Sequence, residues 1–262
     1  MRTSSMRAFS LVELSIVLVI LGLIVGSILS GRSLIRASEL RAVGTEYGRW
    51  VTATHTFRDK YFGLPGDLAN ATMVWGKDNV KCTGDTGTTT VPGTCNGNGD
   101  GNIYINSATT GATGEMFQYW KQLALSGLIE GTYSGVNTGD ADTATIGTNV
   151  PASKLNQAGW TMAYGSIIVA GPAALNVDYN SNLFIFGQNN VSNEPTTNIT
   201  LSPEEAWNID TKMDDGKPGR GRIIGLRWAL CTTAAANTDL DSAYLLNNGG
   251  AVGCALIFFP RF

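Results

Sequence analysis

The chain has 262 residues, a formal net charge of −3 at pH 7, 15% charged residues and 32 glycines. That length allows one large domain, or a domain with an appendage. The Lys and Arg residues form no basic cluster in the sequence, so nucleic acid is not expected as the main partner. The low charge and the many Gly, Thr, Asn and Ser residues are typical of an extracytoplasmic surface rich in turns and loops.

A long apolar segment follows a short polar leader, residues 1–8. Residues 9–31 carry a single charge, Glu13. A helix needs about 20 residues to cross a bilayer, so this segment of 23 residues is long enough to span one. We therefore expect a single-pass membrane protein.

Arginines flank the apolar segment on both sides. Arg2 and Arg7 precede it and predict a cytoplasmic N-terminus, with the rest of the chain outside. Arg32 and Arg36 follow the segment and weaken that prediction.

Glu13 is unusual in such a segment, because a carboxylate inside a membrane helix costs a few kcal/mol and so indicates a function. The segment itself offers no partner for this charge. The free amine of a newly cut N-terminus on a neighbouring subunit is a suitable partner. Such a pairing would favour assembly, because a buried charge is less costly when it is matched.

The six residues AFSLVE at positions 8–13 resemble the class III signal of type IV prepilins and type II secretion pseudopilins. The resemblance covers residues 1–35 strongly. It implies cleavage between Ala8 and Phe9 by a prepilin peptidase, N-methylation of Phe9, and contact between Glu13 and an adjacent subunit's N-terminus. The family usually has Gly before the cut, where this chain has the small residue Ala8.

The same resemblance implies a structural subunit of a type IV pilus or a pseudopilus, rather than an enzyme. Its implied partners are other pilin or pseudopilin subunits, the peptidase and an inner-membrane assembly platform. Its implied location is the inner membrane with the head in the periplasm before assembly, and a periplasmic or extracellular filament afterwards. Two alternatives explain less: a secretory signal peptide has an apolar core of about 7–15 residues, and a plain signal anchor gives no reason for Glu13.

The helical pattern continues beyond the apolar segment. Apolar and aromatic residues recur every three or four positions, which predicts one face of a helix; they are Leu40, Val43, Tyr47, Trp50, Thr54, Phe57 and Tyr61. No proline precedes Pro65, so we expect one helix from residue 9 to about residue 60. Two helices separated around residues 30–33 are the alternative. The glycines in this helix permit partial unwinding or close packing in lipid, and the sequence does not distinguish the two.

The remaining residues predict a globular head with a pilin-like, α+β architecture, in which an antiparallel sheet packs on the long helix. The expected helices are residues 115–129 and 203–213, the second with Ser202 as N-cap and Pro203 in its first turn. The expected strands are residues 159–169, 183–187, 223–232 and 254–260. The expected parts of the chain are leader 1–8, filament-core or transmembrane helix 9–31, amphipathic helix 32–62 and head 63–262.

Two stretches of the head add to the resemblance. The residues LPGD at 64–67 and the run from Asp210 to Gly216, together with the Asn-rich loop between them, look like a large-headed branch of the prepilin family. Pro65 and Gly66 suit a turn, and Asp67 is expected to cap a following helical turn.

Four cysteines are present and none forms a CxxC pair, which with a single histidine argues against zinc. An even number outside the cytoplasm favours two disulfides. Each neighbouring pair brackets a loop rich in Gly, Thr or Asn, so we expect Cys82–Cys95 and Cys231–Cys254. The alternative is four free, buried thiols.

Residues 96–103 place oxygen-bearing side chains at alternate positions, which is the spacing of an EF-hand type calcium loop. The expected ligands are Asn96, Asn98, Asp100 and Asn102, with Glu115 from the next helix in place of the usual last glutamate. With one strong carboxylate in the loop, calcium would bind weakly. The alternative is a cluster of Asn-Gly turns beside a disulfide.

A weaker metal candidate is the acidic group Asp210, Asp214 and Asp215 at a predicted helix end, where a solvated turn is the alternative. The sequence has no GxSxG motif, no Ser/His/Asp set in the head and no phosphate-binding glycine loop. The runner-up function is a minor tip subunit whose large head acts as an adhesin or binds a ligand. A retractile pilus, a secretion pseudopilus and a DNA-uptake fibre remain open.

Overall fold

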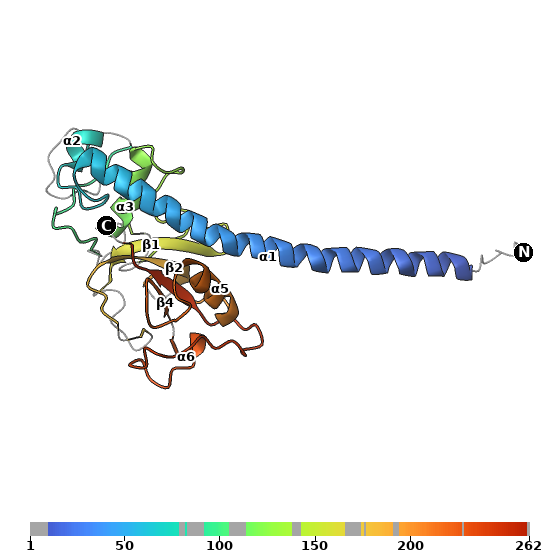
Figure 1. The fold of residues 1–262 in the computed structure, drawn as a ribbon. Coiled ribbons are helices and arrows are strands. Elements are labelled where there is room, and N and C mark those ends of the chain that lie inside the picture. The colour runs from blue at the N-terminus through green and yellow to red at the C-terminus, as the bar shows by residue number, and fades with distance from the viewer. Residues whose placement is uncertain are drawn as a thin grey trace, which may run out of the picture.

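The computed structural model describes residues 10–78, 82, 92–104, 114–137, 143–165, 174–175, 177–190, 194–226 and 228–260. One helix, α1 (Leu11–Tyr61), has 51 residues and projects far out of the rest of the molecule (Figure 1). The predicted single helix is confirmed, and the alternative with a break around residues 30–33 is wrong. The predicted cleavage site, Ala8 and Phe9, lies outside the described residues.

The two halves of α1 have opposite environments. The large apolar side chains described between Leu11 and Ile28 are all 49–86% exposed. In the second half the predicted stripe faces inward, with Val43, Tyr47, Trp50, Thr54 and Phe57 buried and its two end residues partly buried. We call residues 11–35 the stem and the rest of the described chain the head.

The head contains a five-stranded antiparallel sheet in the order β1-β2-β5-β4, with β3 paired to β2 off this path. The strands are β1 (Ala158–Tyr164), β2 (Asn182–Asn190), β3 (Glu194–Asn198), β4 (Ile223–Leu226) and β5 (Ala255–Phe258). The predicted α+β class is confirmed.

Both faces of this sheet are buried. In β2, Phe184 and Phe186 join the cluster that contains the α1 stripe, whereas Leu183 and Ile185 join a second cluster on the opposite face. This alternation follows from the two-residue period of a strand. At the centre of the first face the ring of Tyr47 lies 4.9–6.4 Å from the rings of three aromatic residues of the sheet. The second half of α1 is therefore part of the core of the head.

Four shorter helices complete the described head: α2 (Ala71–Trp75), α3 (Glu115–Leu125), α5 (Pro203–Met213) and α6 (Trp228–Cys231). The bounds predicted for α5 are confirmed, with Ser202 and Glu205 forming a capping box. Residues 115–129 were expected to be helical throughout, but α3 ends at Leu125, because Gly127 takes a positive φ of 73° and ends the helix by a turn.

The strand predictions are partly wrong. Residues 223–232 form β4 and then α6 rather than one strand. Part of the segment 159–169 lies outside the described residues, and β1 covers its first part. Neither α2 nor β3 was predicted; β3 contains Glu and Pro, which are depleted in strands. Asp67 does not cap α2, whose N-cap is Asn70.

Both predicted disulfides, Cys82–Cys95 and Cys231–Cys254, are present, and no free cysteine remains among the described residues. The alternative of four free thiols is wrong. Each bond closes a chain segment within the head, so it restricts the unfolded chain there and leaves the stem unconstrained.

Candidate functional site

The stem begins with a capping box. The Ser10 N–H donates to Glu13 Oε2 at 2.9 Å, and the Val12 N–H donates to Ser10 Oγ at 3.2 Å. Glu13 lies at the third helical position, where a carboxylate satisfies a free backbone donor and interacts favourably with the helix dipole. The same geometry turns its carboxylate toward the end of the helix where the predicted cut lies.

Helix α1, which contains the stem, is the one helix in the described chain that is long and apolar enough to cross a membrane, by length and composition. In the most apolar stretch of 18 residues of this helix, no residue is buried within the protein. An exposed apolar surface that extends along a whole helix segment is compatible with lipid or another protein around it.

A bidentate ion pair between α1 and α5 lies where the stem joins the head. The guanidinium of Arg36 donates to both carboxylate oxygens of Glu205, at 2.5 and 2.7 Å. Hydrogen bonding to Glu205 raises the pKa of Arg36. Planar pairing of this kind fixes direction as well as distance, so it holds the first turn of α5 against α1 where the stem ends.

A second polar contact joins α1 to the head further along the helix. Glu46 is 7% exposed, and its two carboxylate oxygens accept hydrogen bonds from the Lys154 N–H and the Trp160 Nε1–H, both at 2.8 Å. The sequence did not single out Glu46. The sequence feature that could have indicated Glu46 is its position: it is a charged residue directly before Tyr47 of the apolar stripe.

The Asn-rich loop is organised around a carboxylate that the sequence prediction did not include. Asp67 accepts hydrogen bonds from the backbone N–H groups of Gly99, Asp100 and Gly101, at 2.6, 3.2 and 2.8 Å. Burial raises the pKa of Asp67 in spite of these donors. A run of glycines that turns successive N–H groups inward makes a pocket for an anion, and here Asp67 fills it.

Two of the predicted calcium ligands are engaged in similar contacts. The Thr72 N–H donates to Asn96 Oδ1 at 2.9 Å. Glu115 is buried, and its two oxygens accept from the N–H groups of Asn98 and Tyr104, at 3.0 and 2.8 Å. Burial raises the pKa of Glu115.

The other predicted ligands hydrogen-bond within the loop. The Asp100 N–H donates to Asn98 Oδ1, and the Asn102 N–H donates to Asp100 Oδ1. These bonds give the loop a structural role that requires no ion. Calcium at this loop stays a prediction.

The weaker metal candidate forms a compact group. One carboxylate oxygen of each of Asp210, Asp214 and Asp215 lies within 4.8 Å of one oxygen of the other two. No other group of three or more potential metal ligands from His, Cys, Asp or Glu occurs in the described part of the chain. Each carboxylate also accepts a backbone N–H of the turn between α5 and β4, from Gly216, Ile223 and Lys217 respectively. The three acids therefore hold this turn whether or not a cation binds.

Asp210 differs from its two neighbours because it is fully buried. Burial is the main reason that its pKa is raised from 3.8 to about 7, against hydrogen bonds from the Tyr244 hydroxyl and the Gly216 N–H. The Tyr244 hydroxyl lies 2.8 Å from Asp210 Oδ2. Asp210 thus links α5 to the C-terminal part of the head.

No protein-family model matches this chain, and no curated protein or solved structure matches it either.

Proposed function

We propose that this chain is a prepilin: the precursor of a filament subunit of the type IV pilin or pseudopilin class, held in the inner membrane by its stem with the head in the periplasm. One observation carries the proposal. A single helix supplies both an exposed apolar stem with one acid, Glu13, and the central face of the head's core. A helix used in this way joins a membrane-stored segment rigidly to a folded domain.

Glu13 supplies the free-energy difference between membrane and filament. Apolar side chains are equally well accommodated by lipid and by other apolar helices, so they give little preference for assembly. A carboxylate is costly in lipid and less so beside a cation. Cleavage between Ala8 and Phe9 would create that cation, the new N-terminal amine, and assembly would bring it to the Glu13 of a neighbouring subunit.

The capping geometry supports this role. Glu13 Oε2 accepts the Ser10 N–H, and no hydrogen bond to Glu13 Oε1 occurs within the described residues. Ser10 directly follows the proposed new N-terminus. The carboxylate therefore lies at the tip of the stem, where the amine of a neighbouring stem can reach it.

The connection between stem and head gives the filament its regularity in this proposal. The Arg36–Glu205 pair and the two hydrogen bonds to Glu46 tie α1 to the head at separate levels. The position of a packed stem would then determine the position of its head.

Mass spectrometry of the protein isolated from its own cells tests the processing step. We expect a mature chain that begins with N-methylated Phe9. A chain that retains residues 1–8, or one that lacks the stem, would contradict the proposal.

Replacement of Glu13 tests the assembly step. Glu13→Gln keeps the shape of the side chain and removes its charge, so we expect normal membrane insertion and loss of incorporation into filaments. Ile20→Val, a change on the same exposed surface, is the matched control and should assemble normally. Normal incorporation of Glu13→Gln would refute the charge pairing.

A further inference from the structure

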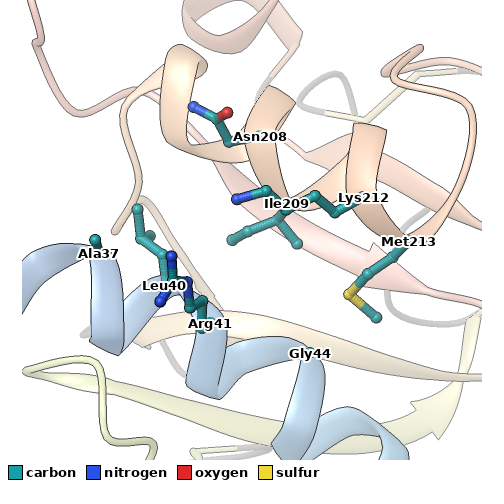
Figure 2. Close-up of a pocket in the computed structure, with 8 residues that line it drawn as sticks. All are labelled: Ala37, Leu40, Arg41, Gly44, Asn208, Ile209, Lys212 and Met213. Atoms are coloured by element: carbon teal, nitrogen blue, oxygen red, sulfur yellow. The ribbon is translucent and has the colours of Figure 1, made fainter.

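Two pockets lie at opposite ends of the part of α1 that the head buries. The first, between α1 and α5, is on the stem side and is lined by apolar side chains and two exposed cations (Figure 2). The second, of about 790 Å³, lies beside the last turn of α1, where Phe62 lines it together with Gly99 and Gly101 of the Asn-rich loop. This second pocket leaves the loop open to water, and Asn98, Gly99 and Asp100 are all exposed.

The loop contains the pair Asn98–Gly99, whose atoms can close into a ring. The backbone nitrogen of a residue can attack the side-chain carbonyl carbon of an asparagine before it, and glycine is the residue that hinders this approach least, because it has no Cβ. The two reacting atoms, Asn98 Cγ and the Gly99 nitrogen, are close along the chain. Closure of the five-membered imide therefore needs only rotation about the bonds of Asn98.

Each atom of this reaction has a partner in the loop. The Gly99 N–H donates to Asp67 Oδ1 at 2.6 Å, so a carboxylate is in place to take its proton. Asn98 Oδ1 accepts the Asp100 N–H at 3.0 Å, which is a donor for the negative charge that develops on this oxygen during attack. The leaving nitrogen, Asn98 Nδ2, donates to Asp100 Oδ2 at 3.0 Å. A nucleophile, a base and an oxyanion donor therefore meet at one asparagine.

We propose that the folded head catalyses its own modification at Asn98, which becomes aspartate or isoaspartate through a cyclic imide. The Gly99 nitrogen gives its proton to Asp67 and forms a bond to Asn98 Cγ. The bond from Cγ to Nδ2 breaks, and Nδ2 leaves as ammonia after a proton returns to it through water. A water molecule then opens the imide at either carbonyl, which restores one N–H and leaves one new carboxylate. The proposal does not depend on the filament function proposed above.

The other Asn-Gly pairs of the sequence, Asn96–Gly97 and Asn248–Gly249, lack this set of contacts. The Gly97 N–H donates to the Leu68 carbonyl oxygen at 3.1 Å, and a neutral carbonyl is not a base. The side-chain amide of Asn248 donates to the Ala251 carbonyl oxygen at 3.4 Å. No carboxylate accepts the Gly249 N–H in the described part of the chain. The base is therefore specific to Asn98.

The pair Asp100–Gly101 shares half of the arrangement. Asp67 accepts the Gly101 N–H through its second oxygen, Oδ2, at 2.8 Å. The side chain before this nitrogen is a carboxylate, which is a poor electrophile when ionised and would have to lose hydroxide. We therefore expect imide formation at Asn98 and not at Asp100.

The reaction changes the loop irreversibly. An aspartate at position 98 places a second negative charge where an amide donated to Asp100, so two like charges face each other. An isoaspartate carries the main chain through the former side-chain carbonyl, which displaces the N–H groups that surround Asp67. The loop of an old subunit would then differ from that of a new one.

The test compares the Asn-Gly pairs within the same molecules. The full chain in detergent, with a chelator to keep the loop free of divalent cations, is incubated in water enriched in heavy oxygen, either folded or in guanidinium. Opening of the imide takes one oxygen atom from this water, so fragmentation in a mass spectrometer locates each product. We expect the ratio of product at Asn98 to product at Asn96 to be several-fold higher in the folded chain than in the unfolded chain.

Variants assign the effect to the base. Asp67→Asn keeps an oxygen for the loop N–H groups and removes the carboxylate, so the ratio should fall to its value in the unfolded chain. Glu115→Gln is the matched control, because it also replaces a buried carboxylate of the loop, one that accepts the Asn98 N–H at 3.0 Å and contacts no reacting nitrogen. It should leave the ratio unchanged. Near-ultraviolet circular dichroism checks that both variants fold.

Three results would overturn the inference. They are an equal ratio in the folded and unfolded chain, an unchanged ratio in folded Asp67→Asn, and an equal loss in Glu115→Gln, which would assign the effect to the shape of the loop. If Asp67→Asn does not fold, the comparison of the folded with the unfolded chain still decides the question. None of these outcomes involves Ala8, Phe9 or Glu13, so each leaves the proposed function intact.

Discussion

The stem and the head-bound half of α1 are the same helix in two opposite environments. In the stem, the described large apolar side chains lie around the helix and are all exposed; in the head, apolar side chains form a stripe that is buried against the sheet and α3. In Figure 1 the first half of α1 projects from the head. Uniform apolarity suits a surrounding that is apolar on every side, such as lipid or a bundle of other stems. A stripe suits one protein core.

The polar residues of the two halves differ in the same way. Glu13 has one hydrogen bond to its own helix end, while Glu46 accepts hydrogen bonds from a backbone amide and an indole of the head. The hydrogen bond of Glu13 therefore stays within its own helix end. The second half has its partners inside the chain.

Truncating one large side chain in each half of α1 should give the largest difference between the halves in the free energy of unfolding. Phe57 is fully buried and its ring lies 4.6 Å from that of Tyr61 and 5.9 Å from that of Trp75. We expect Phe57→Ala to lower the free energy of unfolding of the head by about 3–5 kcal/mol. Ile20→Ala, in the exposed stem, should change it by less than about 0.5 kcal/mol.

Chemical unfolding of the full chain in detergent, followed by near-ultraviolet circular dichroism, measures both variants. Equal effects of the two substitutions would mean that the halves of α1 are not energetically separate.

The pH dependence of stability should be confined to the head. Asp210 has its pKa raised from 3.8 to about 7 by burial. Between these values the unfolded chain has lost the proton that the folded chain keeps, so stability falls as pH rises from about 4 to 7 and this group adds no change above or below that window. The loss is on the order of a few kcal/mol.

Asp210→Asn tests this assignment, because it keeps an oxygen for the Gly216 N–H and cannot titrate. Thermal unfolding from pH 4 to 8 should be flatter for this variant than for the unmodified chain. An unchanged pH profile would assign the dependence to another group.

The features that the sequence could predict are those set by local pattern. The period of the α1 stripe, the Ser202 cap with Pro203, and loops bracketed by cysteines each depend on residues close together in the chain. The single long helix, α5 and both disulfides follow from them and are confirmed.

The features it could not predict depend on contacts between distant residues. Asp67 pairs with a loop more than 30 residues later, and Glu46 pairs with residues more than 100 positions away. Nothing near either residue in the sequence indicates its donors. For the same reason the spacing of residues 96–102 predicted a cation site, without showing that its N–H groups already surround a carboxylate.

Replacing one glutamate in each half of α1, Glu13 in the stem and Glu46 in the head, sharpens the comparison of the two halves. Glu46→Gln leaves one carbonyl oxygen for two donors and turns an amide NH₂ toward the other donor. We expect a loss of about 1–3 kcal/mol in the stability of the head. Glu13→Gln should leave that stability unchanged and affect only assembly.

Both variants can be measured by the same unfolding experiment. A loss of head stability in Glu13→Gln would show that the stem contributes to the head. No loss in Glu46→Gln would mean that the buried carboxylate is not an important link.

The smallest effect is expected at the last turn of α1, where a second phenylalanine behaves oppositely to Phe57. Phe62 ends the helix with φ 59° and ψ 29°, and its side chain is 92% exposed. A residue with a Cβ pays roughly 1–2 kcal/mol in this left-handed region, which glycine occupies freely. Phe62→Gly should therefore stabilise the head by about 0.5–1 kcal/mol, after allowance for the greater freedom of glycine in the unfolded chain.

Phe62→Ala is the matched control: it removes the exposed ring and keeps the strain, so an equal gain from alanine would assign the effect to the ring rather than to the backbone. A gain from glycine alone would show that the chain retains a strained, exposed aromatic residue at the end of the head far from the stem, which the fold itself does not need.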